Sequence, residues 1–367
     1  MDYSYRFRLY PTREQEQLIQ KTFGCVRYVY NHFLAERTSS YQQTGKSLTR
    51  FQQDKELTAL KQELNWLREP DKCALQNSLK ALDFAFQNFF RRVKAHEKPG
   101  YPRFKSKKDR HRSYQTNCNI KVLGKHIQLP KLGKVRCAIS KEVKGRILHA
   151  TITQVPSGKY YISLCCTEVE SPVLPKTGAV VGVDLGIKDL AITSDGVKYA
   201  NSRFIQQAEQ RLARLQRQLS RRAKGSRNRE KARTKVAKLQ EHIANQRRDT
   251  LHKVTTDLVR KYDTICIEDL NAKGMVKNHH LAKAVSDASF GEFRRQLEYK
   301  ALWYGKEIIT IGRFYPSSQL CSCCGAQWAG TKDLSIRGWI CQECGAQHDR
   351  DINAAKNILK EGLQLAA

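Results

Sequence analysis

The sequence predicts an α/β protein of two main domains, with a small metal-binding unit inserted in the second. Three observations support this prediction. The chain has 367 residues, which is more than one typical domain. The segment 171–178 (SPVLPKTG) contains two prolines and directly precedes a new apolar strand, so we expect a linker and the main domain boundary there. Two Cys-x-x-Cys-Gly pairs toward the end of the chain predict the inserted unit.

The first half of the chain changes from a helical to a strand-like pattern. Residues 3–10 alternate apolar and polar side chains and are followed by Pro11, which predicts a strand. Residues 11–96 keep apolar side chains at helical spacing. Residues 97–170 begin as a basic stretch rich in Gly and Pro and continue as short apolar runs. We therefore expect a helical domain followed by a small β unit.

The second half alternates between strands and helices. VVGVD (180–184) is an apolar strand that ends in a carboxylate, and DLAIT (189–193) is its expected hairpin partner. Residues 202–261 predict two long helices in a hairpin. TICIE (264–268) predicts a second strand that ends in a carboxylate, and DINAAKNIL (351–359) predicts a helix.

The composition predicts a polyanionic partner. Lys and Arg number 66 against 35 Asp and Glu, so the net charge is +31, and the basic residues recur along the whole chain. A surface of this charge favours nucleic acid as the partner. No apolar run approaches the roughly 20 residues of a membrane span, so no membrane partner is expected. The first ten residues lack the apolar region of a signal peptide, and we expect a cytoplasmic protein.

Four cysteines have the spacing of a zinc site. Cys321 and Cys324 form one Cys-x-x-Cys-Gly pair, Cys341 and Cys344 form the other, and 16 residues separate the pairs. Four thiolates at this spacing suit tetrahedral zinc, and a site filled by protein ligands is structural and not catalytic. Cys323 is an alternative ligand, although only Cys321 has the x-x spacing to Cys324.

The other seven cysteines are expected to be small buried hydrophobic side chains without chemistry, because most lie among apolar neighbours. A disulfide framework is not expected in a chain of this size without an export signal. These cysteines are Cys25, Cys73, Cys118, Cys137, Cys165, Cys166 and Cys266.

Three carboxylates are the candidate catalytic residues: Asp184, Glu268 and Asp351. Two of them end strands and the third opens a helix, where an acidic residue is favoured, so all three can converge on one sheet edge. The sequence shows no cationic partner for them, so their repulsion favours bound cations, and magnesium is the natural choice. Two such ions about 4 Å apart could activate water and stabilise the leaving 3′ oxygen in phosphodiester hydrolysis.

Alternatives to this assignment exist at the level of single residues. Any one of the three acids taken alone is more simply a solvated strand-end carboxylate, and only their joint placement favours a site. Asp349 is the alternative to Asp351. Asp189 and Asp269 are expected to be secondary, since Asp269 points to the opposite strand face from its neighbour.

Several ordered motifs cover nearly the entire chain. They are YRFRLYPTREQE, CVRYVYNHFL, YPRFKSK, GVDLGIKDLA, IEDLNAKGMVKN, SDASFGEFRRQLEYKALWYG, the two CxxCG pairs and DRDINAAKNIL. Together they resemble the TnpB family of transposon-encoded, RNA-guided DNA endonucleases, compact relatives of the type V CRISPR effectors. The resemblance implies that Asp184, Glu268 and Asp351 form a RuvC triad and that the four paired cysteines are the zinc ligands.

The resemblance also implies a fold and partners. The implied domains are a wedge β-barrel (1–10 and 97–170), a helical recognition domain (11–96), a linker (171–178), a RuvC/RNase H-like nuclease domain (179–316 and 347–367) and an inserted zinc ribbon (317–346). A guide RNA from the transposon end would recognise double-stranded target DNA by base pairing, and the protein would read only a short target-adjacent motif. The expected assembly is a monomer with its RNA.

Five polar residues are candidates for reading that motif. Lys72 and Gln76 lie four residues apart on one predicted helix face, and Gln115, Thr116 and Asn117 lie in the SYQTN segment. Their side chains can reach base edges and phosphates. For each of them, an ordinary exposed polar residue is an equal alternative.

Three other functions compete with the endonuclease. They are a nuclease-silent RNA-guided DNA-binding repressor, an accessory protein of transposition such as a DNA-strand transferase, and a zinc-ribbon module that only binds nucleic acid. The intact carboxylates argue against the repressor, and the zinc-ribbon module leaves them unexplained. A DNA-strand transferase would be marked by a catalytic tyrosine or a histidine pair, which we do not find.

Overall fold

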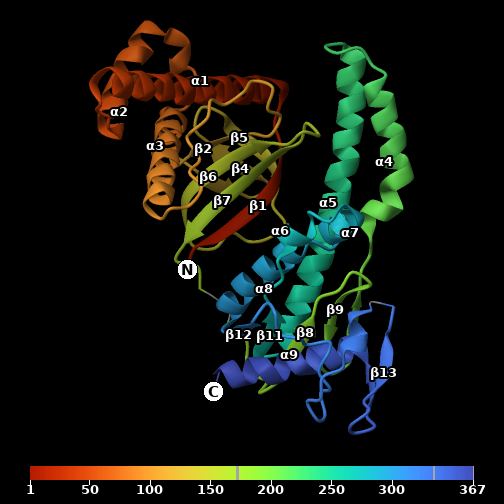
Figure 1. The fold of residues 1–367 in the computed structure, drawn as a ribbon. Helices are drawn as coiled ribbons and strands as arrows, with labels where there is room; N and C mark the ends of the chain where they lie inside the picture. The colour runs from red at the N-terminus through yellow and green to blue at the C-terminus, as the bar shows by residue number, and fades with distance from the viewer. Residues whose placement is uncertain (171–172, 334, 367) are drawn as a thin grey trace. The chain divides into compact units, whose positions relative to one another are not determined.

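The computed structural model describes residues 1–170, 173–333 and 335–366 (Figure 1). The chain divides into two compact units, residues 1–170 and 171–367. This division falls at the start of the expected linker 171–178, of which residues 171 and 172 lie outside the described part. Within the described residues, none of the helices combines the length and the apolar character that crossing a membrane requires.

The first unit contains a seven-stranded antiparallel sheet with the order β2-β6-β7-β1-β5-β4-β3. The predicted N-terminal strand is confirmed as β1, which lies between β7 and β5. The strands are β1 (Tyr3–Tyr10), β2 (Arg112–Thr116), β3 (Lys121–Leu123), β4 (His126–Leu129), β5 (Gly133–Ala138), β6 (Arg146–Gln154) and β7 (Tyr160–Thr167).

Closure of this sheet into the expected β-barrel is not found. No strand pairing among the described residues joins the two edge strands, β2 and β3. The outer edge of β2 meets helix α3 (Lys72–Lys94) instead, and the side-chain amide of Asn77 on that helix donates to the backbone carbonyl of Gln115 at 3.1 Å. A helix that covers a sheet edge and satisfies one of its carbonyls takes the place that a closing strand would occupy.

Three long helices of the first unit share one hydrophobic core with the sheet. The helices are α1 (Arg13–Thr44), α2 (Arg50–Glu63) and α3, with a short 3₁₀ turn, η1 (Asn65–Arg68), before α3. Helix α1 begins as predicted after the strand, with Thr12 as N-cap in a capping box with Gln15. Side chains of the helices and of the strands belong to a single buried cluster. The helical region and the β region therefore stabilise one another.

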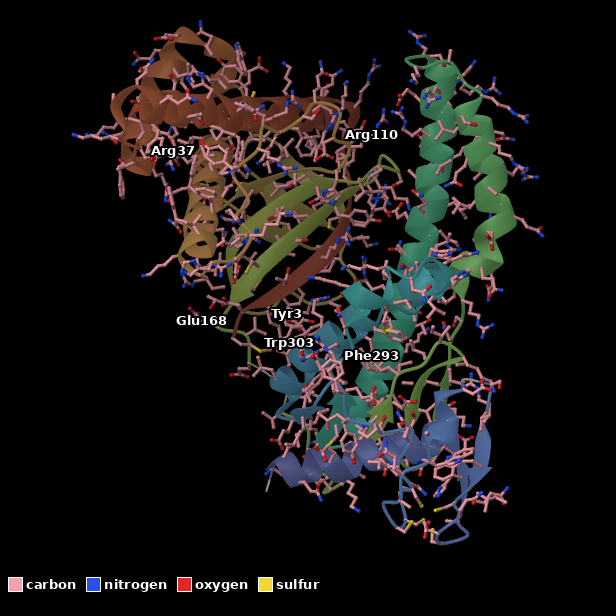
Figure 2. All side chains as sticks on the ribbon, viewed as in Figure 1. Tyr3, Arg37, Arg110, Glu168, Phe293 and Trp303 are labelled. Atoms are coloured by element: carbon pink, nitrogen blue, oxygen red, sulfur yellow. A yellow bond between two sulfur atoms is a disulfide. The ribbon has the colours of Figure 1, made fainter. Side chains whose placement is uncertain are left out.

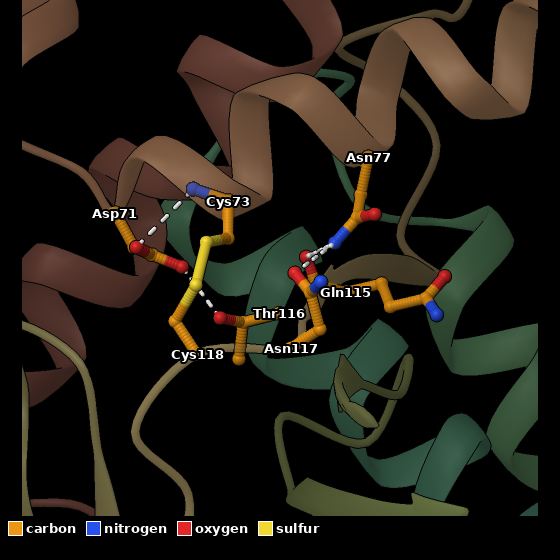
Figure 3. Close-up of a disulfide and its surroundings, with 7 residues drawn as sticks. All are labelled: Asp71, Cys73, Asn77, Gln115, Thr116, Asn117 and Cys118. Atoms are coloured by element: carbon orange, nitrogen blue, oxygen red, sulfur yellow. Dashed lines mark hydrogen bonds between the residues drawn. A yellow bond between two sulfur atoms is a disulfide. The ribbon is translucent and has the colours of Figure 1, made fainter. Parts of the chain in front are cut away.

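One prediction about the cysteines was wrong. Cys73, in the first turn of α3, and Cys118, just after β2, form a disulfide across 45 residues of sequence (Figure 3). The two residues meet because α3 lies against β2, a tertiary contact that cysteine spacing does not reveal. The remaining five predicted non-ligand cysteines are free, and all but the half-buried Cys165 are buried.

The second unit is built around a five-stranded mixed sheet with the order β10-β9-β8-β11-β12. Strands β8, β11 and β12 are parallel, while β9 and β10 continue the sheet in antiparallel fashion from β8, which confirms the predicted hairpin. The strands are β8 (Val180–Asp184), β9 (Asp189–Thr193), β10 (Lys198–Ala200), β11 (Thr264–Glu268) and β12 (Glu307–Ile311). A separate two-stranded sheet joins β13 (Gly338–Ile340) and β14 (Gln347–Asp349).

Helices cover both faces of the five-stranded sheet. Val181 and Ile265 on one face pack with α5 and with the fully buried Phe293 of α8 (Figure 2). Cys266 faces the other way and packs against Ile358 of α9. The predicted helical hairpin is confirmed as α4 and α5. The helices of this unit are α4 (Phe204–Ser220), α5 (Arg227–Lys261), α6 (Ala272–Met275), α7 (His279–Ala288), α8 (Phe290–Tyr304), the 3₁₀ turn η2 (Ala329–Lys332) and α9 (Arg350–Ala366).

Helix α9 lies unusually close to the sheet at two glycines. A Cβ atom at Gly182 of β8 would lie 2.0 Å from the backbone oxygen of Ala355, and a Cβ at Gly362 of α9 would lie 2.4 Å from Sγ of Cys266. Both positions therefore require glycine because of the close approach. The fit fixes the distance of α9 from the strands that it crosses.

The disulfide leads to a stability prediction for the first unit. Replacing Cys118 by Ser, Cys118→Ser, should lower the free energy of unfolding of this unit by about 2–4 kcal/mol, because the bond closes a long loop in the unfolded chain. Unfolding of the full chain, followed by amide hydrogen exchange in α3 and β2 with and without reductant, measures this loss.

The matched control is Cys137→Ser, which replaces a buried free cysteine of the same unit. Its unfolding should still respond to reductant, whereas that of Cys118→Ser should not. Thiols are also counted by titration in the unfolded protein, after treatment with chelator and without reductant. We expect ten free thiols, and a count of twelve would contradict the disulfide.

Candidate active site and metal centre

Two of the predicted carboxylates lie at the ends of neighbouring parallel strands. Val183 of β8 pairs with Ile267 of β11, so the next residues along each strand, Asp184 and Glu268, leave the sheet at the same edge. Carboxyl ends of parallel strands are where α/β sheets form their binding sites. Asp351 lies in the first turn of α9, which crosses both strands.

The charges of these three side chains interact. Burial, followed by repulsion from Glu268 and Asp351, raises the pKa of Asp184 to about 7. Burial also raises the pKa of Glu268, although the hydroxyl of Ser317 donates to its Oε1 at 2.5 Å and opposes that shift. A bound cation would relieve the cost of holding these carboxylates ionised side by side.

A basic residue that the sequence did not reveal lies beside one acid. Nη1 of Arg337 lies 3.5 Å from Oδ2 of Asp351, a loose pair in which the guanidinium side chain is half exposed. The three acids are also less tightly gathered than the cysteines, because their oxygens do not all fall within 4.8 Å of one another among the described residues.

The neighbouring aspartates have structural partners. Oδ1 of Asp349 accepts hydrogen bonds from the backbone N–H groups of Asp351 and Ile352, at 3.0 and 3.1 Å, and so caps the start of α9. Its other oxygen pairs with Lys198 at 2.7 Å. Asp269 pairs with Arg294 and Arg313. These contacts favour Asp351 over Asp349 as the site residue.

The four predicted cysteines converge on one point. Sγ of Cys321 lies 3.6 Å from that of Cys344, Sγ of Cys324 lies 3.6 Å from that of Cys341, and all four sulfurs lie within 4.8 Å of one another. Burial raises the pKa of Cys321, but hydrogen bonds from the backbone N–H groups of Cys324 and Cys323 outweigh it and lower the pKa to about 5. The gathering of four sulfurs suits a soft divalent metal ion.

Two further residues lie near this cluster. Nε2 of the buried His348 is 3.1 Å from Sγ of Cys321. His348 and the exposed Cys323 form a second possible ligand group with Cys321. His348 can instead donate to a metal-bound thiolate, as residues around metal ligands commonly do. The sequence analysis named Cys323 as an alternative but did not identify His348.

Two asparagines of the DINAAKN motif join the first cysteine pair to α9. Asn353 accepts from the backbone N–H of Ser322 at 2.9 Å and donates to the carbonyl of Leu320 at 2.6 Å. Asn357, one turn later, donates to the carbonyls of Ser317 and Leu320, each at 2.7 Å. Both side chains are buried. The cysteine cluster and the helix that carries Asp351 are therefore held together by buried hydrogen bonds, whose only sequence signal is the four-residue spacing of the asparagines.

Of the five residues predicted to read a DNA motif, Gln115, Thr116 and Asn117 lie near the disulfide of the first unit (Figure 3). Lys72 and Gln76 lie in the first turns of α3, the helix that carries Cys73. Lys72, Gln76 and Asn117 are exposed and Gln115 is half-buried. Thr116 differs, because its side chain is fully buried and its hydroxyl donates to Asp71 at 2.5 Å. In this structure its side chain holds α3 against β2 and does not face solvent.

Three family models match parts of the chain. One described as "Helix-turn-helix domain" matches residues 1–46, one described as "Probable transposase" matches 163–279, and one described as "Cas12f1-like, TNB domain" matches 290–358. Residues 1–46 form strand β1 and one continuous helix, α1, so this structure has no break between two helices there.

Relatives match over the whole length of the chain. The "Putative RNA-guided DNA endonuclease" of Streptomyces pristinaespiralis is 40% identical over 99% of this chain and 90% of its own length. The "Putative RNA-guided DNA endonuclease InsQ" of Escherichia coli (strain K12) is 35% identical over 98% of this chain and 92% of its own length. The "TnpB-like protein L79" of Acanthamoeba polyphaga mimivirus is 33% identical over 38% of this chain. The chain belongs to the TnpB family.

This TnpB family member also shares its fold with a solved structure. The protein in "Cryo-EM structure of the Cas12f1-sgRNA-target DNA complex" aligns with a TM-score of 0.58 over 98% of both chains, at 13% sequence identity. At that identity the likeness shows the fold alone. It extends over both units of the chain, as the predicted resemblance did.

The roles of the two neighbouring aspartates can be separated by measuring stability. Asp349→Ala should destabilise the first turn of α9 by about 0.5–2 kcal/mol because it removes the N-cap acceptor. Asp349→Ser keeps an acceptor and should lose far less. Asp351→Asn should cost little, since it removes a charge that repels Asp184.

Amide hydrogen exchange of the first turns of α9 is the measurement. Equal protection in Asp349→Ala and in the parent protein would contradict the capping role. Strong loss of protection in Asp351→Asn would mean that Asp351, too, serves mainly to stabilise the helix.

Proposed function

We propose that the chain is an RNA-guided DNA endonuclease that hydrolyses phosphodiester bonds of double-stranded DNA beside a short target-adjacent motif. The carrying observation is the convergence of Asp184, Glu268 and Asp351, from three separate segments, at one edge of the mixed sheet. This arrangement supports a RuvC-type site. The net charge of +31 supports nucleic acid as substrate and partner.

The three carboxylates would hold magnesium. Two such ions, when bound, would supply an activated water and stabilise the leaving 3′ oxygen. The residues of this chain fix the geometry. Asp184 and Glu268 are held by the strand register, Ser317 orients Glu268 through its hydrogen bond, and Asp349 sets the start of the helix that carries Asp351.

The cysteine cluster would hold one structural zinc ion. The four sulfurs of Cys321, Cys324, Cys341 and Cys344 lie close enough to share one ion. With four protein ligands a tetrahedral zinc would have no position open for substrate. Because Asn353 and Asn357 connect this cluster to α9, the metal would act on catalysis through the position of Asp351.

A guide RNA would supply sequence recognition. The relatives at 40% and 35% identity carry the name of RNA-guided endonucleases, and a broad positive charge suits a protein that holds an RNA–DNA duplex by its backbone. Lys72, Gln76 and Asn117 are exposed on the face where we propose that the motif is read, with Gln115 beside them. Thr116 would support this face from beneath.

The central test is Asp184→Ala. The full chain is purified with the RNA that it carries from co-expression with its locus, and is incubated with a guide-matched plasmid library in magnesium. We expect guide-dependent double-strand cuts beside one short motif. In Asp184→Ala, cleavage should fall below detection while RNA and target binding are kept, because this charge serves the metal ions and not the nucleic-acid backbone.

Asp189→Ala is the matched control, since it removes a carboxylate of the neighbouring strand that belongs to no triad. A cutting Asp184→Ala protein contradicts the triad. Guide-dependent binding without cutting by the parent protein would favour the nuclease-silent repressor. If no specific RNA copurifies with the protein, the RNA-guided function is contradicted and only the metal-dependent nuclease site remains to be tested.

Zinc removal has its own test. Cys341→Ser should lose the metal and reduce cleavage, because the second cysteine pair ends only seven residues before Asp351. Elemental analysis of the purified protein measures the zinc directly. Cys323→Ser is the matched control and should keep one zinc per chain. A full zinc content in Cys341→Ser would contradict the ligand assignment.

A further inference from the structure

The loop after β12 carries an aromatic side chain that the fold does not use. Phe314 is 92% exposed, the largest exposed fraction among the large hydrophobic side chains of the described residues. Its neighbour Tyr315 points inward and packs with Ile311 and Ile358. Exposing a phenyl ring forgoes about 1.5–3 kcal/mol of burial, which a partner outside the chain could recover.

This loop lies at the edge of the sheet that holds the carboxylates. Ile311, the last residue of β12, is level with Glu268 in the parallel pairing of β12 with β11. Phe314 follows three residues later. It therefore stands at the same edge as the candidate active site, and not on a remote surface of the unit.

Both sides of the loop are anchored to the strand end that carries Glu268. On one side Arg313 pairs with the side chain of Asp269, and its Nε donates to the carbonyl of Asp269 at 3.2 Å. On the other side Ser317 donates to Glu268 itself at 2.5 Å. Phe314 is thus held between two contacts to consecutive residues, so little conformational freedom of the loop remains to be lost on binding.

We propose that Phe314 stacks on an unpaired base of the DNA strand that enters the active site, next to the phosphodiester bond to be cut. This inference rests on the proposed endonuclease function. A strand must leave the duplex for its backbone to reach half-buried carboxylates, and its bases then lose their stacking partners. An exposed aromatic ring provides a partner for any base, at about 1–3 kcal/mol for each base, without reading sequence.

Phe314 therefore binds substrate, and its ring holds the DNA strand in position for hydrolysis. The identity of the base is immaterial, because every base has a π-face. The contact consequently acts on the cleavage rate at any guide-matched target, and leaves guide binding and motif choice unchanged.

The first test compares cleavage rates of the guide-loaded full chain. Phe314→Ala should cut about 5- to 150-fold more slowly at limiting enzyme, the fold-change that corresponds to loss of one stacking contact. Phe314→Trp should cut within about 3-fold of the parent, because any aromatic ring can stack. Leu302→Ala, which removes another 80% exposed apolar side chain of the same unit, should be unaffected.

The second test asks whether the ring acts through a base. Targets carrying a single abasic nucleotide are scanned across the cleavage region. At one position the abasic target should slow the parent protein, while Phe314→Ala should show no further loss there, because the two changes remove the same contact. Additive effects at every position, or equal rates for Phe314→Ala and the parent, would overturn the proposal. A Phe314→Trp protein as slow as Phe314→Ala would overturn it as well.

A third measurement keeps this inference separate from the endonuclease function. Single-stranded DNA containing 2-aminopurine is bound to the full-length Asp184→Ala protein. This binding measurement does not depend on cutting. Fluorescence quenching that disappears in the Asp184→Ala, Phe314→Ala double variant supports stacking even if the parent never cleaves. Unchanged quenching overturns it. Loss of bound guide RNA in Phe314→Ala would assign the ring to the RNA and overturn the proposal too.

Discussion

Two half-buried carboxylates that lie side by side are the constraint on which the second unit depends. Asp184 and Glu268 cannot separate, because the register that pairs Val183 with Ile267 is fixed by the apolar core on either side of these strands. Each buried valine or isoleucine contributes roughly 1.5–3 kcal/mol, enough for a few of them to hold an unfavourable pair of charges in place. The result is a rigid site whose electrostatics favour a cation.

The third carboxylate reaches this edge through the placement of one helix. Gly182 and Gly362 set how close α9 comes to the strands, while Asn353 and Asn357 fasten it to the cysteine cluster. The glycines act by steric fit, and the asparagines by satisfying backbone groups that are buried. Since both kinds of contact act on the same helix, the cysteine cluster is part of the geometry of the carboxylate site.

Features with a local signal were predictable from the sequence. Strands that end in Asp184 and Glu268, the helix that begins near Asp351 and the spacing of the four cysteines are all visible within short windows. Features that depend on contacts between distant segments were not. The Cys73–Cys118 bond needs the packing of α3 on β2, and the same helix meets the edge strand β2 of the open sheet.

The two adjacent aspartates show where a local pattern stops being informative. In the sequence Asp351 is the chosen candidate and Asp349 its alternative, and the backbone hydrogen bonds at the start of α9 identify Asp349 as a capping residue. Thr116 is the corresponding case in the first unit. It lies between two exposed or half-exposed polar residues, but strand alternation turns its side chain inward, where it meets Asp71. A buried contact beneath Gln115 and Asn117 limits the motion of the segment that carries them, and a surface ordered before binding loses less entropy when it meets its ligand.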